Sequence, residues 1–202
     1  MSKDKETEEK ILEAATNVFY TRGYFGTRMQ DIADAAGINK AMLHYYFRSK
    51  DKLFEQIFER ASGKILFTVW QSLGADGKSF DEKIELFIDN YMDLLTENRY
   101  IPAFLLHEIN HNPERIGRFF DEQAHGLPRK FMNTLMDEME SGKIRPVDPR
   151  QFVLSLLGLC IFPFAAYPLW KRVMDFDDDE FYEFMEKRKE FLKDFVMNGI
   201  KS

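Results

Sequence analysis

The sequence predicts an all-α protein with a small N-terminal domain and a larger C-terminal domain. Apolar residues recur at helical spacing in successive segments. Residues that favour helix starts and stops separate these segments, and no segment shows the strict alternation of a strand. The chain has 202 residues, enough for a proper core and one or two domains. We expect a three-helix domain over residues 1–50 and a helical domain over residues 51–202.

The first helix is predicted by an apolar stripe that ends at Gly23. Thr27 and Gln30 then have the S/T-x-x-E/Q spacing of a capping box, so a second helix is expected to begin directly after Thr27. The stripe consists of Ile11, Ala15 and Phe19.

A tight turn and a third helix follow. Gly37 can adopt the left-handed backbone that ends a helix, and Asn39 is a favourable N-cap for the next one. Leu43 and Phe47 are four residues apart and are expected to point inward. The other side carries a cation, a methyl, an imidazole and a phenol, which suit the base edges of a major groove. This outward face consists of Lys40, Ala41, His44 and Tyr45.

The charge distribution separates the two predicted domains. Residues 1–60 hold ten Lys/Arg and ten Asp/Glu, whereas residues 61–202 carry the whole net charge of −6. A local excess of positive charge lies between Arg22 and Lys52. Ser49 is expected to cap a fourth helix with Lys50 in its first turn, where both can hold a phosphate. This pattern argues against a general nucleic-acid coat and favours a helix-turn-helix protein that touches DNA only with its first domain.

Residues 8–56 resemble the N-terminal DNA-binding domain of TetR/AcrR-type transcriptional regulators. The resemblance rests on EEKILEAATNVFYTRGYFGTR and on IADAAGINKAMLHYYFRSKDKLFE, which match in register. Position 41 is often glycine and position 44 is often tyrosine in the family, so Ala41 and His44 bear on base preference. His44 can also titrate near neutral pH. The resemblance implies phosphate contacts by Thr27, Arg28, Tyr46 and Lys50, and contacts with base edges or the groove wall by Lys40, Ala41, Met42, His44 and Tyr45.

The larger domain is predicted as a series of helices, which brings the total to nine or ten. Long apolar stripes, a Ser79–Glu82 capping box and proline-led starts at Pro113 and Pro149 define them. Gly126 and Pro128 are expected to interrupt one of them. The predicted helices run over about residues 50–73, 80–97, 102–110, 149–170 and 178–198. One more is expected to begin at residue 113, and another to end at about residue 140.

By the same resemblance, the last two long helices are expected to form a homodimer interface, over about residues 148–170 and 177–198. A two-fold dimer reads an inverted-repeat operator in double-stranded DNA. The resemblance implies a repressor, without catalytic residues or a cofactor, that a small and largely apolar effector releases from DNA. The alternative to DNA binding is that the first domain is a three-helix packing module with no nucleic-acid partner. The alternative to the dimer interface is that the apolar faces of the last helices pack wholly within one subunit. For each candidate effector contact taken singly, packing in the core is the favoured explanation. The candidates are Phe67, Trp70, Phe87, Tyr91, Phe104, His107, Phe131, Cys160 and Phe164.

Two short motifs suggest metal sites. His107-Glu108-Ile109-Asn110-His111 spells H-E-x-x-H, the helix motif of zinc hydrolases. The extended form with a third histidine is absent, so a zinc hydrolase is the lesser alternative and no metal is expected. An acidic run has part of the EF-hand spacing but lacks its glycine, and acids at a helix N-terminus explain it more simply. The run consists of Asp175, Asp177, Asp179 and Glu186.

Residues 152–170 contain no charge over nineteen positions, a length that could span a bilayer. Pro163 and Pro168 interrupt the stretch, and a buried helix can be equally apolar. We therefore expect no membrane span. Cys160 is the single cysteine and the first ten residues are polar, so the sequence predicts neither a disulfide framework nor a signal peptide. The predicted location is the cytoplasm.

Overall fold

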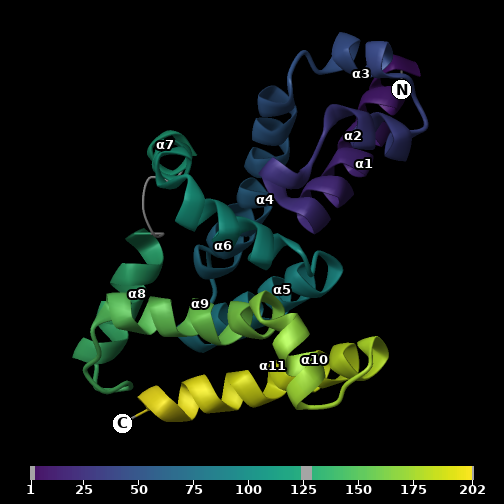
Figure 1. Cartoon of the computed structure of the whole chain (residues 1–202). Helices are drawn as coiled ribbons and strands as arrows, with labels where there is room; N and C mark the ends of the chain where they lie inside the picture. The colour runs from purple at the N-terminus through teal and green to yellow at the C-terminus, as the bar shows by residue number, and fades with distance from the viewer. Residues whose placement is uncertain (1–2, 124–128, 202) are drawn as a thin grey trace. The chain divides into compact units, whose positions relative to one another are not determined.

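The computed structural model describes residues 3–123 and 129–201, and within them it is all-α, as predicted (Figure 1). The predicted interruption at Gly126 and Pro128 lies outside these residues. Apart from one isolated bridge between Ile144 and Lys201, the described residues form no β structure. The helices are α1 (Lys3–Gly26), α2 (Met29–Ala36), α3 (Lys40–Tyr46), α4 (Lys50–Leu73), α5 (Phe80–Glu97), α6 (Ile101–His111), α7 (Pro113–Gln123), α8 (Arg129–Glu140), α9 (Pro149–Ala165), α10 (Tyr167–Val173) and α11 (Asp178–Ile200).

Backbone contacts divide the chain into two compact units, Met1–Gly63 and Lys64–Ser202. The domain boundary predicted from the sequence lies at residue 50, where α4 begins. The first unit extends further because the first turns of α4 contribute Leu53, Phe54 and Ile57 to its core, each at most 1% exposed. Helix α4 therefore has residues in both units.

The core of the first unit contains the predicted apolar stripe of α1. Ile11, Ala15 and Phe19 are all fully buried, as predicted. The ring of Phe19 meets that of Phe54 edge to face, with 4.9 Å between the centroids. Gly23 has a φ of 65°, a left-handed conformation that ends the regular part of α1, also as predicted.

The start of α2 differs from the prediction. Its N-cap is Arg28, and the backbone N–H of Arg28 donates to Oδ2 of Asp31 at 2.9 Å. The Thr27 hydroxyl, which was expected to cap α2, instead donates to the carbonyl oxygen of Gly23 at 2.7 Å. The prediction of a Thr27–Gln30 box was wrong because the broken end of α1 leaves a carbonyl that needs a donor.

The remaining helix boundaries of this unit agree with the predictions. Gly37 has a φ of 67°, and Oδ1 of Asn39 accepts a hydrogen bond from the N–H of Met42 at 2.8 Å. Oγ of Ser49 accepts one from the N–H of Lys52 at 3.2 Å, so it caps α4. These residues fix where α2 ends and where α3 and α4 begin.

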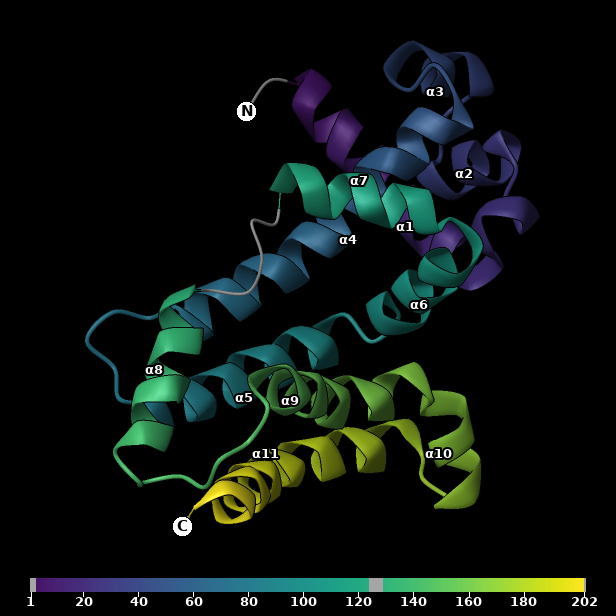
Figure 2. The ribbon, with the colours of Figure 1, turned by 90° about the vertical axis from the view of Figure 1, so that its left-hand side faces the viewer.

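The second unit has its core around α5, which packs against α9 and α11 (Figures 1 and 2). The predicted capping box starts α5: Oγ of Ser79 accepts from the N–H of Glu82 at 3.3 Å, and Oε2 of Glu82 accepts from the N–H of Ser79 at 2.8 Å. Helices α9 and α11 lie antiparallel, since the N–H of Arg145, before α9, donates to the carbonyl of Ile200, at the end of α11.

The predicted helix over 149–170 is two helices. Helix α9 continues through Pro163 and ends at Ala165, and α10 starts after Ala166 with Pro168 in its first turn. This break accounts for eleven helices in the described residues where nine or ten were predicted. In the described ranges, no single helix is long and apolar enough to cross a membrane. Helices α9 and α10 pass that test only as a pair, and they are bent by 70°.

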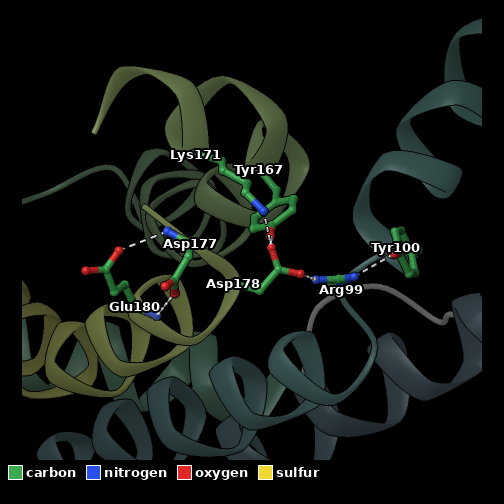
Figure 3. Close-up of polar contacts among 7 residues, drawn as sticks. All are labelled: Arg99, Tyr100, Tyr167, Lys171, Asp177, Asp178 and Glu180. Carbon is green, nitrogen blue, oxygen red and sulfur yellow. Dashed lines mark hydrogen bonds and ion pairs between the residues drawn. The ribbon is translucent and has the colours of Figure 1, made fainter. Parts of the chain in front are cut away.

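A polar network connects α10, α11 and the turn before α6 (Figure 3). Asp178 accepts hydrogen bonds from Lys171, from Tyr167 and, at 3.0 Å, from Arg99. These partners, Lys171 foremost, hold the pKa of Asp178 well below its ordinary value. Asp177 and Glu180 form a capping box at the start of α11. The acidic run therefore serves a helix start, which is the explanation preferred over an EF-hand.

Candidate nucleic-acid interface

The outward face of α3 is open to solvent in the first unit. Lys40, Ala41, His44 and Tyr45 are all exposed, whereas Leu43 on the other side is fully buried. The Tyr45 side chain is 80% exposed and meets the ring of Tyr46 edge to face. Packing in the core does not explain the choice of these four residues, because all are exposed. Tyr45 and Lys40 are therefore available to contact a partner.

Three basic side chains on or beside this face form no ion pair in the described part of the chain. Lys40, Arg48 and Lys52 are exposed, and none of them contacts a carboxylate there. Arg22, in contrast, pairs with Asp31 at 3.1 Å. Arg48 and Lys52 were counted in the local charge excess but were not proposed as contacts. Their absence from ion pairs, which only the structure reveals, makes them candidates for phosphate contacts.

Arg28 and Met42, two further predicted contacts, are also exposed. Tyr46 is partly buried, and its hydroxyl donates to Oδ1 of Asp4 at 3.1 Å. Nδ1 of His44 lies 3.4 Å from the carbonyl oxygen of Arg48, which restrains the ring at the end of α3. Arg28 and Met42 are therefore accessible to DNA, whereas Tyr46 and His44 are restrained by contacts within the first unit.

Thr27 and Lys50 occupy structural positions. Thr27 is 1% exposed, with its hydroxyl bound to Gly23. Nζ of Lys50 donates to the carbonyl oxygens of Tyr24 at 2.8 Å and Thr27 at 2.9 Å, and it lies 4.1 Å from the centre of the Tyr24 ring. Lys50 thus fastens α4 to the α1–α2 junction, and a phosphate contact would have to compete with these bonds. Nothing local in the sequence indicates this role, because the partners are 23 and 26 residues away.

Most predicted effector contacts belong to the core of the second unit or lie at its edge. Burial raises the pKa of the Cys160 thiol to about 12, and that of the Tyr91 phenol above its ordinary value. Phe67, which is 65% exposed, and His107 lie on the surface instead. Phe104 is buried on α6, and Trp70 is partly buried against the core. The fully packed core members are Phe87, Tyr91, Phe131, Cys160 and Phe164.

The H-E-x-x-H motif lies on α6 with its glutamate facing away from solvent. Glu108 is 1% exposed, and its Oε2 accepts hydrogen bonds from Arg115 at 3.1 Å and Asn112 at 3.0 Å. The rings of His107 and His111 are exposed and stacked, with centroids 4.0 Å apart. A carboxylate already paired with an arginine is unsuited to act as a general base on a metal-bound water. Among the described residues, no three potential ligands gather for a metal.

A helix-turn-helix unit with an exposed α3, joined to a larger all-α unit, defines the class of helix-turn-helix transcriptional regulators. The chain belongs to the TetR family. The family profile described as "Bacterial regulatory proteins, tetR family" matches residues 11–57, and the profile described as "Tetracyclin repressor-like, C-terminal domain" matches residues 75–202. The resemblance found in the sequence is therefore confirmed, and the chain is a DNA-binding transcriptional regulator.

Named relatives agree with this assignment. The chain is 26% identical over 164 residues to the HTH-type transcriptional regulator RutR of Escherichia coli (strain K12), with 74% of this chain and 69% of that protein covered. It is 25% identical over 138 residues to the biofilm operon icaADBC HTH-type negative transcriptional regulator IcaR of Staphylococcus aureus (strain Newman), covering 68% and 72%. Both relatives are named as regulators of transcription, and neither name describes an enzyme.

Solved structures show the same fold. A Clostridium perfringens putative fatty acid metabolism regulator matches with a TM-score of 0.69 and 22% identity, over 96% of this chain and 99% of that one. HlyIIR, a hemolysin II transcriptional regulator, matches with a TM-score of 0.66 and 20% identity, over 98% of both chains.

Proposed function

We propose that this chain is a cytoplasmic homodimeric repressor. Each subunit would place α3 in the major groove of one half of an inverted-repeat operator, and a small apolar effector would release the dimer from DNA. The observation that carries the proposal is the exposed face of α3 opposite the buried Leu43. IcaR, a relative, is named a negative regulator, which supports repression.

The chemistry of α3 suits direct readout. Lys40 can donate to guanine acceptors, the Ala41 methyl can contact a thymine methyl, and His44 and Tyr45 can each exchange hydrogen bonds with base edges. The cations of Arg28, Arg48 and Lys52 can bind flanking phosphates, which positions the helix without reading sequence. The net charge of −6 would keep the rest of the molecule from binding DNA nonspecifically.

The proposal is tested by DNA binding in solution. Fluorescence anisotropy with DNA from the promoter beside the chain's own gene would compare the wild type with Lys40→Ala and Tyr45→Ala. Each substitution should weaken specific binding by about tenfold or more, since one base contact contributes roughly 1–3 kcal/mol. Lys143→Ala, which removes an exposed cation from the second unit, is the matched control and should change little. Unchanged affinity in both α3 variants would refute the assignment of the reading face.

The dimer is proposed because α9 and α11 expose large apolar side chains. Leu154, Phe191 and Phe195 are 67%, 58% and 55% exposed, and the last two stack on each other at 5.7 Å. A seven-residue α3 reads too few base pairs alone, so a two-fold partner with a second α3 is needed for useful specificity. Covering these rings with the same face of a second copy would remove them from water.

Phe191→Lys tests this interface by placing a charge in its centre. We expect the dimer dissociation constant to rise at least about thirtyfold, as truncation of a central aromatic residue costs about 2 kcal/mol or more. Phe67→Lys is the control, because Phe67 is at least as exposed as Phe191 but lies on α4. Sedimentation velocity measures both variants. Equal dimerisation of Phe191→Lys and wild type would place the interface elsewhere.

Release by an effector requires a difference in effector affinity between the DNA-bound and the free arrangement of the dimer. Helix α4 has residues in both units, so a shift of α4 in the second unit would reach the first unit along one helix. The two α3 helices of a dimer would then lose the half-site spacing that the operator requires. We propose this helix as the route of release.

A further inference from the structure

A cavity of about 250 Å³ that is partly open to solvent lies among α9, α10 and α11 of the second unit, and its lining residues Phe162 and Phe184 are exposed. Helix α11 contributes one face to its wall, because the lining residues Phe181, Phe184, Met185 and Arg188 recur at helical spacing. None of the predicted effector contacts lines it. Its volume corresponds to roughly eight water-sized groups, which is room for a small organic molecule.

Among the described residues, Arg188 is the one charged residue in this wall. Its Nη2 donates to the carbonyl oxygen of Leu159 at 3.0 Å, but its buried Nε has no acceptor in the part of the chain that the structure describes. No carboxylate lies within ion-pair distance of Arg188 in the described residues. Burial lowers the pKa of Arg188 from its ordinary value. A partly buried cation without a counter-ion is unfavourable, and an anion beside it would remove the penalty.

Trp170 is a second donor in the wall without an acceptor. Its Nε1 is buried and has no hydrogen-bond partner in the described residues. Its ring stands edge to face against Phe162, with 5.8 Å between centroids. A buried indole N–H nearly always has a partner. The two residues that carry these unpaired donors therefore line one cavity, whose other lining side chains, such as Phe162 and Phe184, are apolar.

We propose that this cavity binds a small carboxylate with an apolar, ring-sized body, and that this molecule is the effector. Arg188 would hold the carboxylate and the indole N–H of Trp170 would donate to it, while Phe162, Phe181 and Phe184 would surround the body. The identification as effector rests on the proposed repressor function, whereas binding itself does not. A carboxylate of a second copy is the competing occupant. The cavity favours a small ligand, because Arg188 and Trp170, the two residues with unpaired donor atoms, belong to one subunit and line the same cavity.

Calorimetry on the full-length protein tests binding with two probes, 3-phenylpropionate and 3-phenyl-1-propanol. The probes share one body and differ in charge. The carboxylate should bind the wild type about tenfold or more tighter than the alcohol does, as expected for hydrogen bonds to a charged group. Arg188→Gln retains an amide that can donate to Leu159 but removes the charge, and it should abolish the preference for the carboxylate. Lys187→Gln is the matched control, because Lys187 is exposed and pairs with Glu183.

Trp170→Phe is a second variant, which removes the N–H donor together with part of the ring, so its effect is read from the difference between carboxylate and alcohol binding. This variant should bind the carboxylate severalfold more weakly than the wild type does. It keeps the proposal testable if Arg188→Gln does not fold, which circular dichroism would show. No carboxylate binding by the wild type at about 1 mM, or equal binding by wild type and Arg188→Gln, would overturn the site. A dimer dissociation constant that changes in Arg188→Gln while carboxylate binding is unchanged would identify a second copy as the occupant and also overturn it.

Operator binding then separates the site from the effector role. 3-Phenylpropionate should weaken operator binding by the wild type but not by Arg188→Gln. Saturating carboxylate without any effect on operator affinity would show that the site exists but is not the effector site. Absence of operator binding by the unliganded wild type would count against the proposed function and leave the calorimetric result standing.

Discussion

The guanidinium of Arg188 donates to the carbonyl oxygen of Leu159 at 3.0 Å, and this carbonyl is the one that Pro163 leaves without a helical donor. In a regular helix the N–H of residue 163 would bind the carbonyl of residue 159, but proline has no N–H. Arg188 on α11 therefore supplies the hydrogen-bond donor that the backbone of α9 lacks. This hydrogen bond also explains how Pro163 is tolerated inside a packed helix.

A double-mutant cycle measures this relationship. Arg188→Met should lower the free energy of unfolding by about 1–3 kcal/mol, since it leaves the Leu159 carbonyl unpaired. Pro163→Ala supplies a helical N–H, so in that background the cost of Arg188→Met should be smaller by about 1 kcal/mol. Urea titrations of the four proteins give the coupling. Strictly additive effects would show that Arg188 does not substitute for the missing donor.

Lys50 is expected to stabilise the first unit. Lys50→Met removes two hydrogen bonds to backbone carbonyls, of Tyr24 and Thr27, and should cost about 1–3 kcal/mol of unfolding free energy. Lys52→Met, an exposed neighbour, should stay within about 0.5 kcal/mol of wild type. If Lys50→Met instead weakens only DNA binding and leaves the stability unchanged, Lys50 acts on a phosphate, as the family resemblance implied.

Glu108 is expected to matter for stability. Glu108→Gln replaces the carboxylate of a buried pair with Arg115 by a neutral amide and should cost about 1–3 kcal/mol, because a hydrogen bond between two charged groups is lost. His107→Ala removes an exposed ring and should cost less than about 0.5 kcal/mol. Thermal unfolding compares the two variants. In a zinc site, His107→Ala would instead reduce the amount of bound zinc, which elemental analysis detects, whereas Glu108→Gln would leave both histidine ligands in place.

The capping box of α5 predicts a pH dependence of stability. The N–H of Ser79, followed by the Lys78 ammonium, lowers the pKa of Glu82 from 4.5 to about 2. The folded state therefore favours the ionised carboxylate, and its stabilising effect is complete above the unfolded pKa and is lost as the pH falls toward 2. Glu82→Gln should be less stable than wild type near neutral pH, and the difference should shrink as the pH falls from about 5 to about 3.

Urea midpoints across this pH range measure the effect. Glu85→Gln, the same charge change on an exposed part of α5, corrects for net charge. A stability difference for Glu82→Gln that does not depend on pH would show that the carboxylate does not cap the helix.

The sequence alone determined the class of protein because its signals are local. Gly37, Asn39 and Ser49 act on backbone groups within a few residues, so the two short helices and the turn between them could be predicted from neighbouring residues. The outward face of α3 followed from helical periodicity for the same reason, with Leu43 buried on the other side. The α2 cap was missed because Thr27 had a competing partner, the free carbonyl of Gly23.

Only the tertiary structure decided which polar groups lack partners and where a small molecule could enter. Lys50 was expected on a phosphate, but its partners lie 23 and 26 residues away, and Arg188 reaches a carbonyl 29 residues away. The cavity beside Arg188 forms because α9 ends at Ala165, where α10 turns by 70°, and α11 returns antiparallel to α9. Such placements depend on how distant helices pack, and helical periodicity in the sequence states which face is apolar but not which helix will cover it.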